Sequence, residues 1–470
     1  MIDARQRNVA LLVAGCFFME ILDGTIVTTA APRIGIALHV SSTSIGLVIT
    51  SYFIAVAVLI PLSGWMVARF GTRRLFLSAI VIFTLASFLC ATSVSLGELV
   101  AMRVLQGVGG AMMVPVGRLA VLSETAKPNI MRAMSYIVWP ALLAPVIAPL
   151  AGGLITTYAS WRWLFLINIP LGVIALIAAV RLMPSTPTTA PPRLDWVGVV
   201  LTCTGLAGLT YTANLLSEPN AAWSLVVSIG AISIVTLAAT VRHLLRTPDP
   251  LVDLRTLQVR SFRISLTDGS LFFMTFAAVP FLLPLLFENI FRWSPIKAGA
   301  VVLFIFVGNI GIKPATTFLL NRFGFRPILV AATAGLAATI IVSGLFSSAT
   351  PLAFILVITL LSGVARSVGA TAYMTLGFSD VTESQMRHAN SLAATAQQLS
   401  AGLGVAAATV ALRVGAPLGT LFSNHPSQAS DYSLAFILLA LVSLAATVGA
   451  VRLHPEAGNA VRTVRPKAAA

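Results

Sequence analysis

Two carboxyl side chains, Glu20 and Asp23, interrupt an otherwise apolar stretch near the N-terminus. Because they are three residues apart, a helix places them on one face. Burial resists ionisation of a carboxyl group and a nearby cation favours it, so a change of surroundings can load and release a proton. Arg103 lies in a later apolar stretch, where the rise per residue brings its long side chain level with Asp23. The sequence therefore predicts proton binding at Asp23 and Glu20, with Arg103 modulating their affinity. A static ion pair between two helices is the alternative, and a purely structural role is also open for Glu20.

A second set of ionisable residues, Lys313 and Arg366, lies in apolar stretches of the C-terminal part of the chain. Inside a bilayer such groups are costly, at about 2.5–3.5 kcal/mol on insertion scales, so they indicate function. We expect them to line a substrate cavity and to attract an anionic group. The alternatives are pairing with backbone carbonyls or with Asp268, and Lys313 could also extend to the headgroups. For Arg118 that extension to the membrane surface is the expected behaviour.

The elements that position these residues are membrane-spanning helices. The chain has 470 residues, of which 57% are hydrophobic and only 10% charged, whereas soluble proteins carry about 25% charged residues. A helix needs about 20 apolar residues to cross a bilayer. We expect fourteen spans, near 9–31, 45–67, 75–94, 99–122, 133–156, 163–183, 196–216, 222–244, 264–287, 296–320, 328–347, 352–376, 389–412 and 434–453.

The distribution of basic residues tests this count, because cytoplasmic loops are rich in Lys and Arg. With both termini in the cytoplasm, few basic residues fall outside, namely Arg33, Arg162, Arg292, Lys297 and Arg413. The formal net charge of +15 is thus explained by a basic cytoplasmic side, and we expect no binding to nucleic acid. The first apolar run is too long for a signal-peptide core and is expected to be the first span.

The sequence gives little support for catalysis or cofactor binding. All three cysteines lie in apolar runs, and no phosphate-binding loop is recognisable. The five histidines are expected in loops or in the tail, which argues against bis-histidine haem ligation within the bilayer and against a histidine proton relay at its centre. A membrane-embedded transferase would need a catalytic His or Asp, but His39 and His425 have no obvious acidic partner. We therefore expect no enzyme, no catalytic residue, no metal and no cofactor.

An internal repeat divides the chain. The second expected span is followed by Arg-Phe-Gly-Thr-Arg at 69–73, and the tenth by Arg-Phe-Gly-Phe-Arg at 322–326. Both lie after the second helix of a six-helix set, which predicts two related halves with a site between them, as in secondary transporters. The expected parts are an N-terminal half (1–183), two inserted helices with their loops (184–262), a C-terminal half (263–453) and a cytoplasmic tail (454–470).

Several motifs resemble those of the major facilitator superfamily, and specifically its fourteen-span drug:proton antiporters of the EmrB/QacA type. The segments that carry the resemblance are 22–25 (LDGT) with 30–32 (AAP), 64–74 (GWMVARFGTRR), 103–110 (RVLQGVGG) and 161–172 (WRWLFLINIPLG). The resemblance covers essentially the whole chain and is strongest to multidrug resistance proteins of the MdtD type. It also implicates the positions of Asp23 and Arg103 in proton coupling.

The resemblance implies an all-α polytopic membrane protein with the major facilitator fold, two six-helix halves and two inserted helices. The implied function is proton-driven export of small molecules, of multidrug type, from a bacterial inner membrane by alternating access. Export of an anionic metabolite such as an organic acid is the alternative, followed by an importer or facilitator of the same fold. Expected partners are the substrate, protons and lipid, and the chain could act as a monomer, with any periplasmic or outer-membrane adaptor unknown.

Gating is expected at two places that the family motifs cover only in part. Gly71 and Arg73 lie in the loop motif, where Ala68 replaces the usual aspartate. Pro145, Pro149, Gly152 and Gly153 lie in the fifth span, where Ala144 and Ala148 stand before two prolines of a normally glycine-rich motif. Prolines remove backbone donors and glycines allow close approach, so this span is either a pliable gate or merely a kinked, tightly packed helix.

Overall fold

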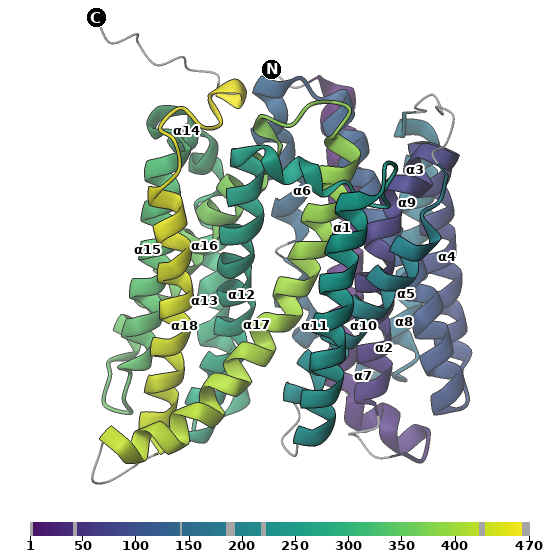
Figure 1. The fold of residues 1–470 in the computed structure, drawn as a ribbon. Coiled ribbons are helices and arrows are strands. Elements are labelled where there is room, and N and C mark those ends of the chain that lie inside the picture. The colour runs from purple at the N-terminus through teal and green to yellow at the C-terminus, as the bar shows by residue number, and fades with distance from the viewer. Residues whose placement is uncertain are drawn as a thin grey trace, which may run out of the picture. The chain divides into compact units, whose positions relative to one another are not determined.

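The computed structural model describes residues 3–40, 45–141, 143–184, 193–217, 222–422 and 428–462. These residues form helices and connecting turns without a β-strand (Figure 1). In a bilayer the helix satisfies every backbone polar group internally, which is why such apolar stretches adopt it. The helices are α1 (Ala4–Ala37), α2 (Gly46–Leu59), α3 (Ser63–Phe70), α4 (Thr72–Thr92), α5 (Leu96–Glu124), α6 (Ile130–Ala141), α7 (Ala144–Tyr158), α8 (Trp163–Leu166), α9 (Asn168–Leu182), α10 (Trp196–Ser217), α11 (Trp223–Arg246), α12 (Arg260–Asn289), α13 (Pro295–Gly311), α14 (Lys313–Phe323), α15 (Phe325–Gly344), α16 (Leu352–Ser379), α17 (Met386–Phe422) and α18 (Gln428–Val451).

Each of the fourteen expected spans coincides with a helix or with a pair of consecutive helices. Among the described residues, 11 spans are long and apolar enough to cross a membrane, and the pair α13 and α14, bent by 51°, makes 12. The two further expected spans correspond to α6 with α7 and to α17. The all-helical fold is therefore confirmed, and fourteen spans are compatible with the described helices.

The chain forms two compact units. Unit 1 comprises Met1–Thr212, Val227–Arg255 and Thr382–Thr395, and unit 2 comprises Ala213–Val226, Thr256–Val381 and Ala396–Ala470. The first turns of α17 thus belong to unit 1 and the remainder of that helix to unit 2. The boundaries expected at 183, 262 and 453 stay a prediction.

The repeated five-residue motif adopts the same turn in both units. Gly71 joins α3 to α4 with φ 79° and ψ 156°, and Gly324 joins α14 to α15 with φ 82° and ψ 173°. These positive φ angles are readily adopted only by glycine, which explains why it stands at the same place in each motif. The repeat detected in the sequence is therefore also a repeat of backbone conformation.

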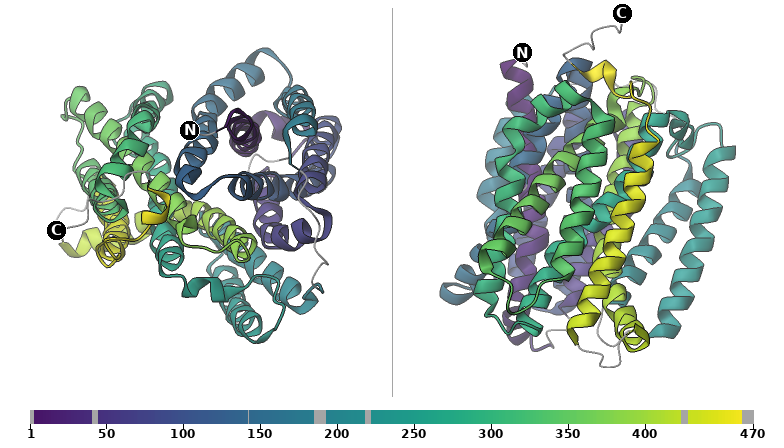
Figure 2. Two further views of the ribbon diagram at one scale, coloured as in Figure 1. Left: turned by 90° about the horizontal axis from the view of Figure 1, so that it is seen from above. Right: turned by 90° about the vertical axis from the view of Figure 1, so that its left-hand side faces the viewer.

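In unit 1, helix α1 occupies a central place. It packs against α5, α6, α7 and α9, and from above it is surrounded by other helices of the unit (Figure 2). Helix α5 lies very close to α2 and α4, because a Cβ at Gly107 would come within 2.6 Å of the Ala55 Cβ and one at Gly109 within 2.7 Å of the Phe83 nitrogen. This contact brings the polar residues of α5 close to those of α1 and α4.

In unit 2, helix α16 packs against α12, α13 and α15, and α15 also packs against α18 (Figure 1). The contact between α13 and α16 is made through glycines. A Cβ on Gly308 would collide with the Leu360 carbonyl oxygen, and one on Gly363 would collide with the Ile305 carbonyl oxygen. Small residues of this kind let two backbones approach closely in a membrane.

Candidate functional site

Asp23 accepts hydrogen bonds from three side chains. Arg103 donates from Nη1 to Oδ2 at 2.5 Å, which forms an ion pair. The amide nitrogens of Gln106 and Asn168 donate to Oδ1 at 2.9 and 2.6 Å. All four side chains are fully buried. The expected contact between Asp23 and Arg103 is therefore confirmed, and both oxygens of the carboxylate are occupied.

Arg103 makes further contacts that hold its guanidinium in place. Its Nη1 also donates to Oε1 of Gln106 at 2.7 Å, and its Nε donates to the Val48 carbonyl at 3.3 Å. The guanidinium carbon lies 4.2 Å from the centre of the Tyr52 ring, where the face of the ring attracts a cation. Only Nη2 lacks a hydrogen-bond partner among the described residues. Arg103 is thus compensated in charge and nearly so in hydrogen bonding.

Three members of this network were not predicted as site residues: Ser87, Gln106 and Asn168. The Ser87 hydroxyl accepts from Gln106 at 2.7 Å and from Asn168 at 3.3 Å, and itself donates to the Phe83 carbonyl at 2.8 Å. Gln106 and Asn168 both lie inside segments that carry the family resemblance, so a polar residue within those motifs was an available signal. For Ser87 the sequence offers no such signal.

The start of α5 is fixed by its own side chains, and this sets the level of Arg103. Ser95 accepts from the Glu98 nitrogen at 3.3 Å, and Glu98 Oε2 accepts from the Val94 nitrogen at 3.0 Å. This reciprocal arrangement resembles a capping box and satisfies backbone donors at the helix start. Arg103 and Gln106 follow within the next three turns.

Glu20 lies outside the network. Its side chain is partly buried, and its Oε2 has no hydrogen-bond partner among the described residues. It lies about one turn before Asp23 on α1. The two acids that the sequence grouped together are therefore in different situations: Asp23 is fully bonded, whereas Glu20 has one oxygen that could exchange a proton without breaking a hydrogen bond.

Arg118 does not extend to the membrane surface as expected. Its side chain is buried, and its Nε donates to Oδ1 of Asn390 at 2.8 Å. Asn390, in the part of α17 that belongs to unit 1, in turn donates to the Pro115 carbonyl at 2.8 Å. The expectation was wrong because Asn390, distant in sequence, supplies an acceptor inside the protein.

Lys313 and Arg366 are both buried in unit 2. Lys313, at the bend between α13 and α14, donates from Nζ to Oγ1 of Thr371 at 2.7 Å. Arg366 lies on α16 with its guanidinium carbon 3.8 Å from the centre of the Phe276 ring. Neither is paired with Asp268, which bonds to its neighbour Thr267, so that alternative is not found. Extension of Lys313 to the headgroups is not found either, since the side chain is only 6% exposed.

The gating candidates occupy helix ends and a broken helix. Arg73, the second residue of α4 after the turn at Gly71, donates to the Val180 carbonyl at 2.6 Å. The fifth expected span is split into α6, which contains Pro140, and α7, which contains Pro145, Pro149, Gly152 and Gly153. Outside its own stretch of helix, no atom of the described residues comes within 4 Å of a Cβ placed on Gly153, so close packing is not the reason for that glycine in this conformation.

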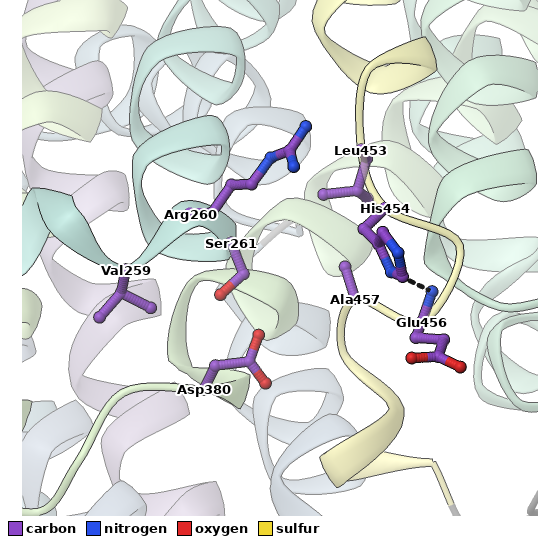
Figure 3. A pocket seen from close by; sticks show the side chains of 8 residues that line it. All are labelled: Val259, Arg260, Ser261, Asp380, Leu453, His454, Glu456 and Ala457. Carbon is purple, nitrogen blue, oxygen red and sulfur yellow. Dashed lines mark hydrogen bonds between the residues drawn. The ribbon is translucent and has the colours of Figure 1, made fainter.

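One pocket, with a volume of about 250 Å³, lies in unit 2 at the ends of helices. It is lined by the start of α12, the end of α16 and the segment after α18, and includes Arg260, Asp380, His454 and Glu456 (Figure 3). The Glu456 nitrogen donates to Nδ1 of His454 at 3.3 Å, as the dashed line shows. Because these residues lie near helix ends, we do not place a transport substrate there.

Within the described ranges, no group of three or more His, Cys, Asp and Glu residues could hold a metal ion. Two histidines expected in loops are in helices: His243 near the end of α11 and His388 near the start of α17. His243 Nε2 lies 2.8 Å from Oδ1 of Asp195, just before α10. His425 lies outside the described residues.

The Asp195 carboxyl, at the start of α10, has a pKa that burial and hydrogen bonds shift in opposite directions. Burial alone acts to raise the pKa of its carboxyl. Hydrogen bonds from the Gly198 nitrogen at 2.8 Å, from His243 and from the Leu251 nitrogen at 3.4 Å have the opposite effect. The hydrogen bonds prevail, and the pKa of Asp195 lies below its usual value.

Comparisons with known proteins agree with this fold. The family model described as Major Facilitator Superfamily matches residues 13–405. A protein of Escherichia fergusonii named "Putative multidrug resistance protein MdtD" is 36% identical over 437 residues, 92% of this chain and 91% of the relative. One of the same name from Pectobacterium atrosepticum is 37% identical over 407 residues, covering 86% of each chain.

Two solved structures share the fold at low sequence identity. The human organic anion transporter MFSD10 (TETRAN) has a TM-score of 0.67 and 14% identity, with 96% of this chain and 100% of that chain covered. The proton:xylose symporter XylE has a TM-score of 0.65 and 14% identity, with 95% of each chain covered. The matched family model, the curated relatives and the helical fold together show that this chain belongs to the major facilitator superfamily of multi-pass membrane transporters.

Proposed function

We propose that this chain is a proton-coupled secondary exporter of small molecules that works by alternating access in a bacterial inner membrane. The observation that carries the proposal is the buried network around Asp23, which joins α1, α4, α5 and α9 through Arg103, Gln106, Ser87 and Asn168. The relatives at 36–37% identity are named as multidrug resistance proteins, which supports export as the direction.

The network supports a switch because it depends on the charge of one carboxylate. An ionised Asp23 can accept from Arg103, Gln106 and Asn168 together, whereas a protonated carboxyl loses acceptor capacity and no longer offsets the charge of Arg103. Protonation would therefore loosen contacts between four helices. Conversely, a conformation that separates Arg103 from Asp23 would favour proton binding. This reciprocity is what coupling requires.

Glu20 would deliver protons to Asp23. Its unpartnered oxygen lies about one turn from Asp23, so it can receive a proton without breaking the network and pass it toward Asp23. In this scheme Glu20 sets the rate at which protons arrive and Asp23 sets the conformational response. Glu20→Gln is then expected to slow proton-driven transport, and Asp23→Asn to uncouple it.

A static ion pair between α1 and α5 is the competing explanation for Asp23 and Arg103. The two explanations differ in what Asp23→Asn does to different modes of transport. Proton coupling predicts that uphill transport driven by a pH gradient disappears while substrate exchange across the membrane continues. A structural pair predicts that both modes fall together, in proportion to the folded protein present.

The decisive measurement uses inside-out membrane vesicles with an imposed pH gradient and two probes built on planar fused rings, ethidium as a cation and carboxyfluorescein as an anion. Accumulation that collapses when an ionophore removes the gradient supports antiport. Accumulation by wild-type protein that does not respond to the gradient would refute proton coupling, and uptake in the opposite direction would favour an importer. Ser217→Ala, a half-buried polar change at the end of α10 whose hydroxyl, among the described residues, donates to the Ala213 carbonyl of its own helix, serves as the matched control.

A further inference from the structure

Arg366 in unit 2 is a buried cation for which the described part of the protein provides no counter-charge. The side chain is 1% exposed, and its Nε and Nη1 have no hydrogen-bond partner among the described residues. It also forms no ion pair with a described carboxylate. Among the described residues its guanidinium lies against the Phe276 ring. A buried, uncompensated cation is expensive unless an anion or strong acceptor binds to it during function.

The neighbours of Arg366 are polar groups that are also unsatisfied. Ser362 lies one turn earlier on the same face of α16, and its hydroxyl has no hydrogen-bond partner within the described ranges. Asn309 of α13 is fully buried, and neither its amide nitrogen nor its amide oxygen bonds to any residue that the structure describes. Its backbone nitrogen would lie 2.9 Å from a Cβ on Gly363, one turn from Arg366. Native proteins leave few buried polar groups unsatisfied, so several on adjoining helices indicate a ligand site.

Aromatic side chains of α12 form the apolar side of this cluster. Phe272, Phe273 and Phe276 contact one another, with ring centroids 5.7 to 6.4 Å apart. Phe272 also contacts Tyr373 of α16, with centroids 5.5 Å apart, and the hydroxyl of Tyr373 again has no hydrogen-bond partner in the described part of the chain. Donor groups beside a set of rings would accommodate a molecule with an anionic group and a planar apolar body.

Lys313 does not belong to the same cluster. Its partner Thr371 lies five residues after Arg366, which at 3.6 residues per turn is about 140° around α16. The two cations that the sequence grouped as one cavity set are therefore reached from different faces of the helix. Lys313 adds to the positive charge of unit 2, but its ammonium already has an acceptor.

We propose that Arg366, with Asn309 and Ser362, binds the anionic group of the transported molecule, and that the substrates include planar organic anions. This inference rests on the proposed function, since it names the substrate class of that exporter. The planar guanidinium can bind a carboxylate through two parallel hydrogen bonds. Because Arg366 is 1% exposed here, the anion enters in another conformation of the transport cycle.

The test compares carboxyfluorescein with ethidium in the vesicle assay, because both probes contain a planar fused aromatic ring system but differ in charge. Arg366→Gln is expected to reduce carboxyfluorescein transport about tenfold or more while ethidium transport falls less than twofold. Arg366→Lys should keep part of the anion transport, since it retains the charge without the two-pronged geometry. Arg263→Gln, which removes an exposed cation from α12 in the same unit, is the matched control.

The outcomes separate this inference from the proposed function. Wild-type protein that moves ethidium but not carboxyfluorescein, or an Arg366→Gln variant that loses both probes equally, overturns the anion site and leaves the exporter intact. Wild-type protein that moves neither probe under a pH gradient overturns both. If Arg366→Gln does not fold, Asn309→Ala and Ser362→Ala replace it, and the same selective loss of the anion is required.

Discussion

Two buried arginines, one in each unit, have the same charge and nearly the same burial but opposite surroundings. Arg103 meets a carboxylate, an amide oxygen, a backbone carbonyl and a tyrosine ring. Arg366 meets only a phenylalanine ring among the described residues. Charge and depth alone therefore do not reveal the role of an intramembrane cation. The role is indicated by whether the protein itself supplies a counter-charge and hydrogen-bond acceptors. A cation with these partners belongs to the folded structure, whereas a cation without them is a candidate for binding an anionic ligand.

The largest change in stability is expected on replacement of Arg103. Replacing Arg103 with Met leaves Asp23 buried without its cation, and removing one partner of a buried pair costs about 3–5 kcal/mol. We expect a large loss of thermal stability in detergent, measured by the unfolding of purified protein. Asp23→Asn combined with Arg103→Met should recover part of that loss. A stable single variant would contradict the claim that the pair is compensated.

Arg118 is an intermediate case, since two of its nitrogens donate to neutral groups of Asn390, the side-chain oxygen at 2.8 Å and the backbone carbonyl at 3.4 Å. Asn390→Ala removes a charge-assisted hydrogen bond and also the donor to the Pro115 carbonyl. We expect a destabilisation of about 1.5–3 kcal/mol. Asn390→Asp is the informative companion, because a carboxylate would strengthen the bond to Arg118. Equal stability of the alanine variant and the wild type would show that other partners suffice.

Arg366→Met should change the stability in the opposite direction when no substrate is present. The apolar side chain fills a similar volume and removes an uncompensated charge, so we expect the protein to become more stable by about 1–2 kcal/mol. Addition of carboxyfluorescein should raise the unfolding temperature of the wild type and not that of the variant. A destabilised variant would show that Arg366 has a structural partner, and the contrast with Arg103 would then fail.

The smallest change in stability is expected on replacement of Asp195, whose charge lies outside the membrane spans. Its folded pKa is below its usual value, so its charge contributes stability above the unfolded pKa of about 3.9. That contribution is lost as the pH falls through the folded value. Asp195→Asn should cost less than about 1 kcal/mol at neutral pH. The difference from wild type should shrink below about pH 4, which unfolding measured against pH would show.

The sequence was sufficient for the framework of the fold and for one contact of the site. Apolar length located the helices, and the repeated Arg-Phe-Gly-x-Arg motif, read as a sign of two related halves, corresponds to two turns with similar positive φ at Gly71 and Gly324. Counting helical rise placed Arg103 level with Asp23. These inferences succeed because helix geometry is regular and local, so distances along a helix follow from residue numbers.

The rest of the site depends on contacts between distant segments. Asn168 reaches Asp23 across 145 residues, and Asn390 reaches Arg118 across 272. No local pattern specifies which neutral polar residue will face a given charge, so Ser87 was missed and Arg118 was expected at the surface. Similarly, Lys313 and Arg366 were grouped by residue type, whereas the rotation of α16 separates the groups that they contact.

Because the Oε2 atom of Glu20 has no hydrogen-bond partner among the residues that the structure describes, Glu20 is also a spectroscopic reporter. The carbonyl stretch of a protonated carboxyl group moves to higher frequency when it accepts no hydrogen bond, whereas the bonded oxygens of Asp23 would absorb lower. Infrared difference spectra recorded across a pH step would therefore separate two acids that lie about one turn apart on α1. Glu20 would give the isolated high-frequency band, and its disappearance in Glu20→Gln would assign it.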